Sequence, residues 1–235
     1  MKLIFLFLLS LSVLLHADTV KIHFVGASKE YKAEDSLKAY KKVLESTFKV
    51  EVTETYTKDK SKDAPNFDKV KDADILVVFA RRLTLSKDNL KLLKGHLEAG
   101  KPVIGIRTAS HAFQNYLELD AKYFGGSYKG HGKDMKVEMA AQNSDDEILK
   151  GIKIQNWQRH DKPYYNDKNA ADVKVLLTGK EPGGRVHPMA WSREINKQRL
   201  FYTSLGLPAD FKDERFVKLL NNALGWALKG TLERK

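Results

Sequence analysis

The sequence predicts a three-layer α/β domain of flavodoxin-like layering, with a mostly parallel sheet and helices on both of its faces. Two observations carry this prediction. Strand-like and helix-like segments alternate from Val20 to Phe113, which is the pattern of successive β–α units. Within that region, residues 73–80, apart from Asp74, and residues 102–106 are apolar, as expected for strands buried on both faces. The chain of 235 residues is long enough for one such domain with a substantial core.

The first β–α unit is predicted at residues 20–48. The apolar run at 20–28 predicts a strand that ends in a glycine loop. A helix should follow over 35–48, with Asp35 as its N-cap and an apolar face at helical spacing, formed by Leu37, Tyr40, Leu44 and Phe48. Residues 49–56 alternate between apolar and other side chains, which predicts the second strand.

The next units complete the expected parallel part of the sheet. Residues 73–80 should form a buried strand, and Ser86 should cap a helix that Gly100 ends. The segment 102–106 is then the next buried strand, and it leads through a sharp turn of small residues into a further helix.

The second half of the chain is less regular. Residues 120–172 are expected to form a loop-rich excursion. Three more strands are predicted at 172–179, 187–193 and 198–206, and a final amphipathic helix at 213–228.

The first 17 residues have the pattern of a secretory signal peptide. Lys2 precedes an apolar run from Leu3 to Leu15, and Ala17 ends the segment. This run is shorter than the roughly 20 residues of a membrane span, although an uncleaved tether is the alternative. We therefore expect an exported protein, periplasmic or secreted, with one domain over residues 18–235 and no stable membrane insertion after cleavage.

Composition excludes some chemistry and some partners. The chain has no cysteine, so it can form neither disulfides nor a thiol nucleophile. Its formal net charge is +11, but the lysines are interleaved with acidic residues along the chain. That arrangement indicates a solvated basic surface and no nucleic-acid partner, with attraction to acidic polysaccharides as an alternative.

The strongest candidate site lies where the strand at 102–106 meets the next helix. Many open α/β enzymes carry a nucleophile at such a strand-to-helix turn, but here the position is Arg107. Arg107, Ser110 and His111 are spaced i, i+3 and i+4, so a helical turn would put them on one face, with Thr108 beside them. An arginine fork and a helix N-terminus together suit a carboxylate, a phosphate or sugar oxygens.

Other candidates follow neighbouring strands at the same edge of the sheet. Arg81 and Arg82 follow the strand at 73–80, and are expected to bind substrate with Arg107. Glu30 and Tyr31 follow the first strand, and Glu30 is a candidate general base or acceptor for sugar hydroxyls, or simply a charge at the helix entry.

The glycine-rich segment 125–132 is interpreted as a mobile flap that carries Tyr128 and His131, with an ordinary surface loop as the alternative. His111 and His131 are the candidates for proton transfer, on the assumption of an ordinary histidine pKa. Ser110 and His111 are adjacent, and adjacent helical side chains diverge by about 100°, so no Ser–His pair is expected.

No metal site or cofactor is expected. The histidines in loops or at element ends show no close ligand spacing, and these are His111, His131, His160 and His187. His23 and His96 are predicted to be structural, and Trp191 is predicted to lie in the core.

Several motifs together resemble the ThuA-like (trehalose-utilisation) family, and most closely its exported bacterial branch. The specific blocks are GIRTASHAF and FYTSLG…DF; weaker ones include FVGASKEY, ADILVVFARRLTL, GGSYKGH and PMAWSR. The similarity extends from about Val20 to Leu228. It implies a fold like that of class I glutamine amidotransferases, with Arg107 at the position of their cysteine nucleophile, and a link to sugar metabolism. The family often has histidine at that turn and another after SLG, where this chain has Leu207.

The resemblance implies a carbohydrate or an oxidised sugar derivative as the ligand, and no glutamine amidotransferase activity. In the leading hypothesis, Arg107 would stabilise a developing oxyanion on a sugar carbonyl or lactone. The sequence does not decide between a sugar-acting hydrolase or isomerase and a non-catalytic sugar- or anion-binding module. It also leaves open a homo-oligomer.

Overall fold

The computed structural model describes residues 19–230 and 232–235. The predicted signal peptide at residues 1–17 lies outside the described part of the chain. Within that part, every helix is too short or too polar to cross a bilayer.

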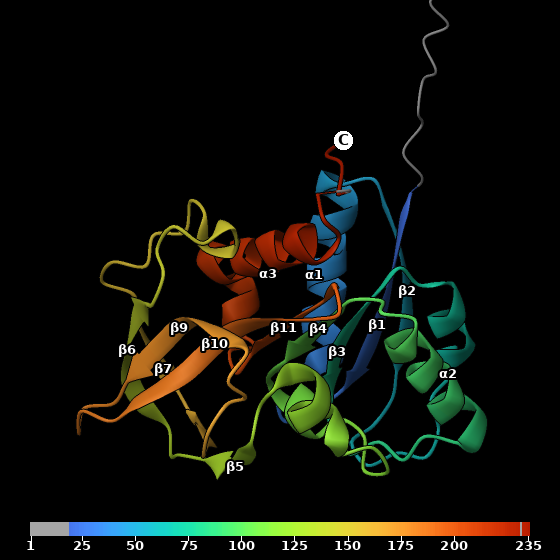
Figure 1. Ribbon diagram of the computed structural model, residues 1–235, viewed down its shortest axis with the longest axis horizontal. Helices are drawn as coiled ribbons and strands as arrows, with labels where there is room; N and C mark the ends of the chain where they lie inside the picture. Colours follow the sequence, from blue (N-terminus) through green and yellow to red (C-terminus); the bar gives the residue numbers. More distant parts are fainter. Residues whose placement is uncertain (1–18, 231) are drawn as a thin grey trace, which may run out of the picture.

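The described residues form a nine-stranded mixed sheet in the order β2-β1-β3-β4-β11-β10-β9-β6-β7 (Figure 1). Its parallel half consists of β2 (Val50–Tyr56), β1 (Val20–Ala27), β3 (Ile75–Ala80), β4 (Val103–Ile106) and β11 (Gln198–Thr203). This order corresponds to the 2-1-3-4-5 order of flavodoxin-like sheets, with β11 as the fifth strand. The α/β class is therefore confirmed, and the expected parallel sheet accounts for half of the observed one.

The other half of the sheet is antiparallel. It continues from β11 through β10 (Val186–Ile195), β9 (Val173–Lys180), β6 (Met135–Ala141) and β7 (Gln158–Asp161). A separate two-stranded sheet pairs β5 (Tyr128–His131) with β8 (Tyr164–Asn166). The prediction of a loop-rich excursion over residues 120–172 was thus wrong, because β5, β6, β7 and β8 all lie in it.

Helices cover both faces of the parallel half (Figure 1). α1 (Ala33–Thr47) and α3 (Glu214–Ala227) pack on one face, and α2 (Lys87–Glu98) and the short η1 (Phe67–Asp72) pack on the other. Each face has its own buried apolar cluster, with Phe24 of β1 in the first and Val25 in the second. The alternation of side chains along a strand produces this division. Four further short helical segments are η2 (Arg107–His111), η3 (Asp120–Phe124), η4 (Glu147–Leu149) and η5 (Asp210–Lys212).

The helix ends test the capping predictions. Ser86 caps α2, since its side chain accepts a hydrogen bond from the Asn89 backbone N–H at 3.2 Å, and Gly100 has a φ of +71° just after the helix. The prediction for Asp35 was wrong. The N-cap of α1 is Lys32, in the left-handed conformation, and Asp35 lies inside the first turn. An acidic side chain is favourable there as well, because it faces the positive end of the helix dipole.

The candidate site lies at the carboxyl ends of β1, β3 and β4, where ligands bind in open α/β sheets. η2 extends directly from β4, and the segment after β3 pairs with the residues after η2. The small β5–β8 sheet carries Tyr128 and Tyr164, whose rings lie against His111 of η2.

Candidate functional site

The turn between β4 and η2 is strained in the way that nucleophile elbows are. Arg107, its first residue, has a φ of +47°, a left-handed conformation that is unfavourable for residues other than glycine. The Tyr202 hydroxyl of β11 donates a hydrogen bond of 2.6 Å to the Arg107 carbonyl and so holds the turn from the neighbouring strand. The predicted elbow is therefore present in the backbone.

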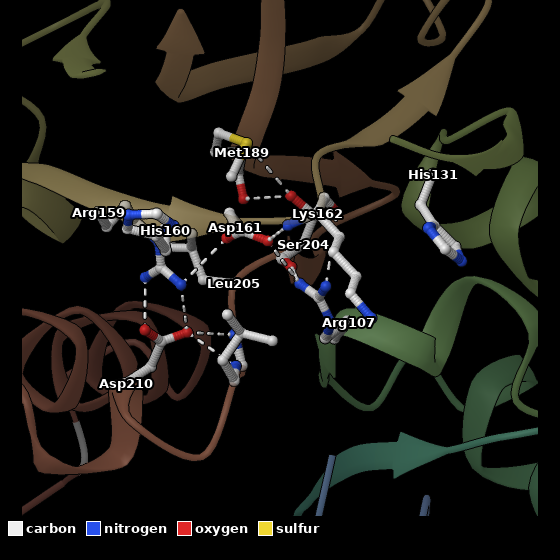
Figure 2. A network of polar contacts seen from close by, with 12 residues as sticks. Arg107, His131, Arg159, His160, Asp161, Lys162, Met189, Ser204, Leu205 and Asp210 are labelled. Carbon is white, nitrogen blue, oxygen red and sulfur yellow. Dashed lines mark hydrogen bonds and ion pairs between the residues drawn. The ribbon is translucent and has the colours of Figure 1, made fainter. Parts of the chain in front are cut away.

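The Arg107 side chain begins a buried chain of ion pairs (Figure 2). Its Nη1 donates to Asp161 Oδ1 at 3.1 Å and to the Ser204 carbonyl at 2.5 Å. Asp161 also pairs with Arg159 at 3.0 Å, and Arg159 pairs with Asp210 at 2.5 Å. Asp210 in turn accepts backbone N–H groups of the loop after β11. The chain thereby connects the elbow, β7 and that loop.

Aromatic rings close the two sides of the Arg107 guanidinium. It lies 4.4 Å from the ring centre of Tyr31 and 4.8 Å from that of Tyr164. Burial alone would lower the pKa of Arg107, but the Asp161 carboxylate outweighs burial and raises that pKa above its ordinary value. Arg107 is thus a permanently charged, ion-paired residue of the interior, and its Nε has no hydrogen-bond partner among the described residues.

This burial corrects three predictions. The side chain of Arg107 has 0% exposure, so it is not available to bind substrate oxygens. Thr108 at 1% and Tyr31 at 3% are likewise interior residues, and Ser110 at 6% and His111 at 8% are only slightly less buried. The physical reason is Asp161, a carboxylate 54 residues away that the sequence pattern did not connect with the elbow.

Ser110 and His111 form the pair that the sequence argument excluded. Ser110 Oγ lies 3.0 Å from His111 Nδ1, within hydrogen-bond distance. The exclusion considered only the directions in which adjacent side chains leave the helix. Nδ1 lies close to its own backbone, however, and rotation about the side-chain bonds brings it back to a neighbouring hydroxyl. Which of the two groups donates depends on the imidazole tautomer.

The imidazole of His111 is packed and neutral. It stacks on the half-buried ring of Tyr128, with ring centres 4.7 Å apart and planes 17° from parallel. Burial lowers the pKa of His111 to about 4, and the positive charges of Arg82 and Arg81 act in the same direction. The expectation of an ordinary pKa was therefore wrong for His111. His111 is 8% exposed, and no group in the described part of the chain is hydrogen-bonded to its Nε2.

Backbone hydrogen bonds hold the end of β3 against η2. The Arg82 N–H donates to the His111 carbonyl at 2.9 Å, and the next residue, Leu83, donates to Ala112 at 2.7 Å. Arg81 is half-buried and pairs with Asp59 at 3.5 Å. Arg82 is exposed and has a φ of +56°. The predicted neighbourhood of these arginines and His111 is thus observed.

The remaining candidates lie around this centre. Glu30 is exposed and pairs with Lys162 at 3.6 Å, so its carboxylate is not free to act alone. His131 is exposed on β5, with its ring centre 6.2 Å from that of Tyr164. Figure 2 shows His131 on a separate ribbon from the Arg107 ion pairs. The segment predicted as a flap is held by pairing with β8 and by Asp120, whose Oδ2 accepts the Tyr128 N–H at 3.1 Å.

The other histidines have structural partners elsewhere. The buried ring of His23 is hydrogen-bonded to Thr53 and Thr55, and His96 is hydrogen-bonded to the Pro102 carbonyl, as predicted. His187 pairs with Glu181 at 2.5 Å. Across residues 19–230 and 232–235, no group of three or more His, Asp or Glu side chains is arranged to hold a metal ion. Trp191 is buried in the core, also as predicted.

Sequence reasoning missed four important residues: Asp120, Asp161, Tyr164 and Asp210. All but Asp210 lie in the region taken for loops, and no periodicity marks them. A possible signal for Asp161 is its alternation with Arg159 in a polar strand, which places both side chains on the same face of β7.

The arrangement offers a ligand several kinds of contact. His111 supplies a neutral imidazole whose Nδ1 is occupied by Ser110, so that Nε2 can accept or donate a proton according to the tautomer. Tyr128 supplies a half-buried aromatic ring and hydroxyl, and Arg82 an exposed cation. These groups suit a small polar molecule rich in oxygen atoms.

Comparisons with known proteins identify a family and several solved structures of similar fold. The chain matches the ThuA family, described as trehalose utilisation, over residues 22–227. No curated protein matches it. Among solved structures, a ThuA-like protein from Bacteroides uniformis has a TM-score of 0.70 at 18% identity, covering 90% of this chain and 92% of that one. One from Parabacteroides merdae has a TM-score of 0.69 at 17% identity, covering 93% of each chain.

A carbohydrate deacetylase, Agd3, has a TM-score of 0.59 at 13% identity, and the match covers 90% of this chain but only 33% of that protein. At these identities the structural likenesses show a shared fold. The family match covers most of the sequence and includes the elbow, His111 and the end of β3. The chain therefore belongs to the ThuA (trehalose utilisation) family.

Proposed function

We propose that this chain is an exported protein of carbohydrate utilisation that binds or converts a sugar or an oxidised sugar derivative at His111. The observation that carries the proposal is the position of a neutral His111, held by Ser110 and stacked on Tyr128, at the ligand-binding end of the sheet. The family's description as trehalose utilisation supports the substrate class. The apolar run at the start of the sequence supports export.

The site is suited to proton transfer at a sugar oxygen. With Nδ1 engaged by Ser110, the imidazole has a fixed orientation, and Nε2 is the nitrogen that meets the ligand. A pKa of about 4 keeps His111 unprotonated at neutral pH, which suits a hydrogen-bond partner or a weak general base better than a general acid. A hydrolase or an isomerase could use this group on a sugar carbonyl or lactone.

A second candidate is a non-catalytic sugar-binding module. It is favoured by the pairing of Glu30 with Lys162, because the carboxylate expected to act beside His111 is already engaged. No other carboxylate is hydrogen-bonded to His111 in the described residues. In this case the aromatic ring of Tyr128 and the polar groups around it would bind a sugar without changing it.

A thermal-shift screen of neutral sugars, keto-sugars and sugar acids tests the shared part of both candidates. The informative variant is His111→Phe, which keeps an aromatic ring against Tyr128 and removes both nitrogens. A sugar should raise the melting temperature of the wild type and not that of His111→Phe. If no sugar shifts the wild type, or if the variant responds equally, the site assignment is wrong.

Product analysis of the stabilising sugar by NMR then separates the candidates, since a binding module returns it unchanged. Glutamine is the negative control substrate. The chain has no cysteine, and Arg107 fills the elbow with a buried cation, so no ammonia should be released from glutamine.

A further inference from the structure

We propose that Arg82 is the specificity-determining residue of this site and that it binds the carboxylate of an anionic sugar derivative, such as a sugar acid. The inference rests on the proposed function and deepens it from carbohydrates in general to singly charged ones. It is carried by the ion pairing of the charged groups near His111 and by the fixed backbone of Arg82.

The charged groups around the site are almost all neutralised by the protein. Arg81 pairs with Asp59 at 3.5 Å, and Glu30 pairs with Lys162 at 3.6 Å. The two buried ion pairs, Arg107–Asp161 and Arg159–Asp210, each carry no net charge. In the described residues, the Arg82 side chain has neither a hydrogen bond nor an ion pair nor a ring contact. Of the arginines named here, Arg82 is thus the one whose charge has no partner among the described residues.

Hydrogen bonds hold the backbone of Arg82 in place beside His111. The Arg82 N–H donates to the His111 carbonyl at 2.9 Å, and Gln114 donates to the Leu83 carbonyl at 2.6 Å, which closes a short parallel bridge between the two segments. These bonds fix the backbone of residue 82 directly beside His111, and its exposed side chain is long enough to extend toward a ligand there.

Arg82 shares an unfavourable backbone conformation with several residues at this edge of the sheet, among them Lys32, Lys60 and Arg107. Its φ of +56° follows β3, and the φ of +47° at Arg107 follows the adjacent β4. Non-glycine residues in this conformation are costly, and in proteins they concentrate at ligand-binding positions. Glycine or asparagine would satisfy the backbone at position 82 at lower cost, but neither would supply a cation.

The single charge favours a carboxylate over a phosphate. A guanidinium fork matches the two oxygens of a carboxylate, and the pair formed is neutral. A phosphate monoester has close to two negative charges at neutral pH, and the second would have no free cation among the groups named here. The expected ligand therefore combines one carboxylate with the hydroxyl groups that suit His111 and Tyr128.

The test is calorimetric titration with D-glucuronate, D-glucose and D-glucose 6-phosphate at about 0.15 M salt, where distant charges are screened. The wild type should bind glucuronate at least tenfold more tightly than glucose. Arg82→Gln should lose that preference while its affinity for glucose is unchanged. Arg82→Lys should keep only part of the preference, because an ammonium group has no fork. The matched control is Arg185→Gln, which removes an equal charge from an exposed residue between β9 and β10.

Three results would overturn the inference. Equal affinity for glucuronate and glucose would show that the carboxylate is not recognised, and tighter binding of glucose 6-phosphate would show that a phosphate is. An equal loss in Arg185→Gln would show an effect of net charge alone. In each case binding of a neutral sugar would leave the proposed function standing, whereas failure of all three sugars to bind would end both proposals.

Discussion

Arg107 donates a hydrogen bond of 3.1 Å to Asp161, and both side chains are completely buried. The two residues lie on segments that are far apart in the sequence, the elbow after β4 and the edge strand β7. Their contact places a cation at the position where related folds present a nucleophile. The elbow in this chain therefore connects β4 to the antiparallel half of the sheet, and the proposed ligand site lies at the next residues, Ser110 and His111.

Asp161→Asn should destabilise the protein severely. The substitution leaves the guanidinium of Arg107 buried with no acidic partner, and breaking a buried ion pair in this way costs about 3–5 kcal/mol. Arg107→Met should cost less, because Asp161 keeps its second partner, Arg159, at 3.0 Å. Urea denaturation of both variants gives the comparison. A loss below about 1 kcal/mol for Asp161→Asn would contradict the assigned role.

The regular part of this fold was predictable because local pattern and tertiary environment agree there. The apolar run at 75–80 and the spaced leucines of α2 require burial wherever they are placed, so their elements follow from the sequence. Ser86 and Gly100 mark helix ends by chemistry that needs no partner from elsewhere.

The site was less predictable because its key contacts are long-range and polar. Nothing near Arg107 in sequence indicates Asp161, and β5 and β7 form from polar segments through pairing with distant strands. The neighbourhood of Arg82 and His111 was predictable from topology alone, since strands that end at one edge bring their following residues together. The Ser110–His111 contact depends on side-chain torsions that spacing does not describe.

The imidazole of His111 should remain neutral well below pH 6.5. Burial lowers its pKa to about 4, so the folded state resists a proton that the unfolded chain accepts at pH 6.5. Between these two pH values protonation favours the unfolded chain, so the free energy of unfolding of the wild type should fall as the pH drops from 6.5 to 4. His111→Phe should lack this part of the fall. NMR titration of the ring protons gives the pKa directly, and a midpoint near 6.5 would contradict the packing described here.

Arg82→Gly should separate binding from folding. Glycine removes the strain at φ +56°, worth about 1–2 kcal/mol, and adds an unfolded-state entropy cost of about 0.5–1 kcal/mol. The variant should therefore be as stable as the wild type or slightly more stable, yet bind sugar acids no better than neutral sugars. A combined measurement of melting temperature and glucuronate affinity tests this. A large loss of stability would mean that the Arg82 side chain has a structural role.

Asp120 should make the protein less stable as the pH rises from about 4 to about 6. Burial raises the pKa of this carboxyl from 3.8 to about 6, against the opposing hydrogen bond from the Tyr128 N–H. The folded state then holds a proton that the unfolded chain releases, so the favourable contribution is complete below pH 3.8 and is lost as the pH passes 6.

Asp120→Asn keeps an acceptor for Tyr128 and cannot ionise. It should exceed the wild type in stability by about 3 kcal/mol at pH 7.5, and the difference should shrink toward pH 4, since each unit of pKa shift corresponds to about 1.4 kcal/mol. Denaturation curves at the two pH values measure this difference, and a gap that stays constant with pH would show that Asp120 does not titrate in this range.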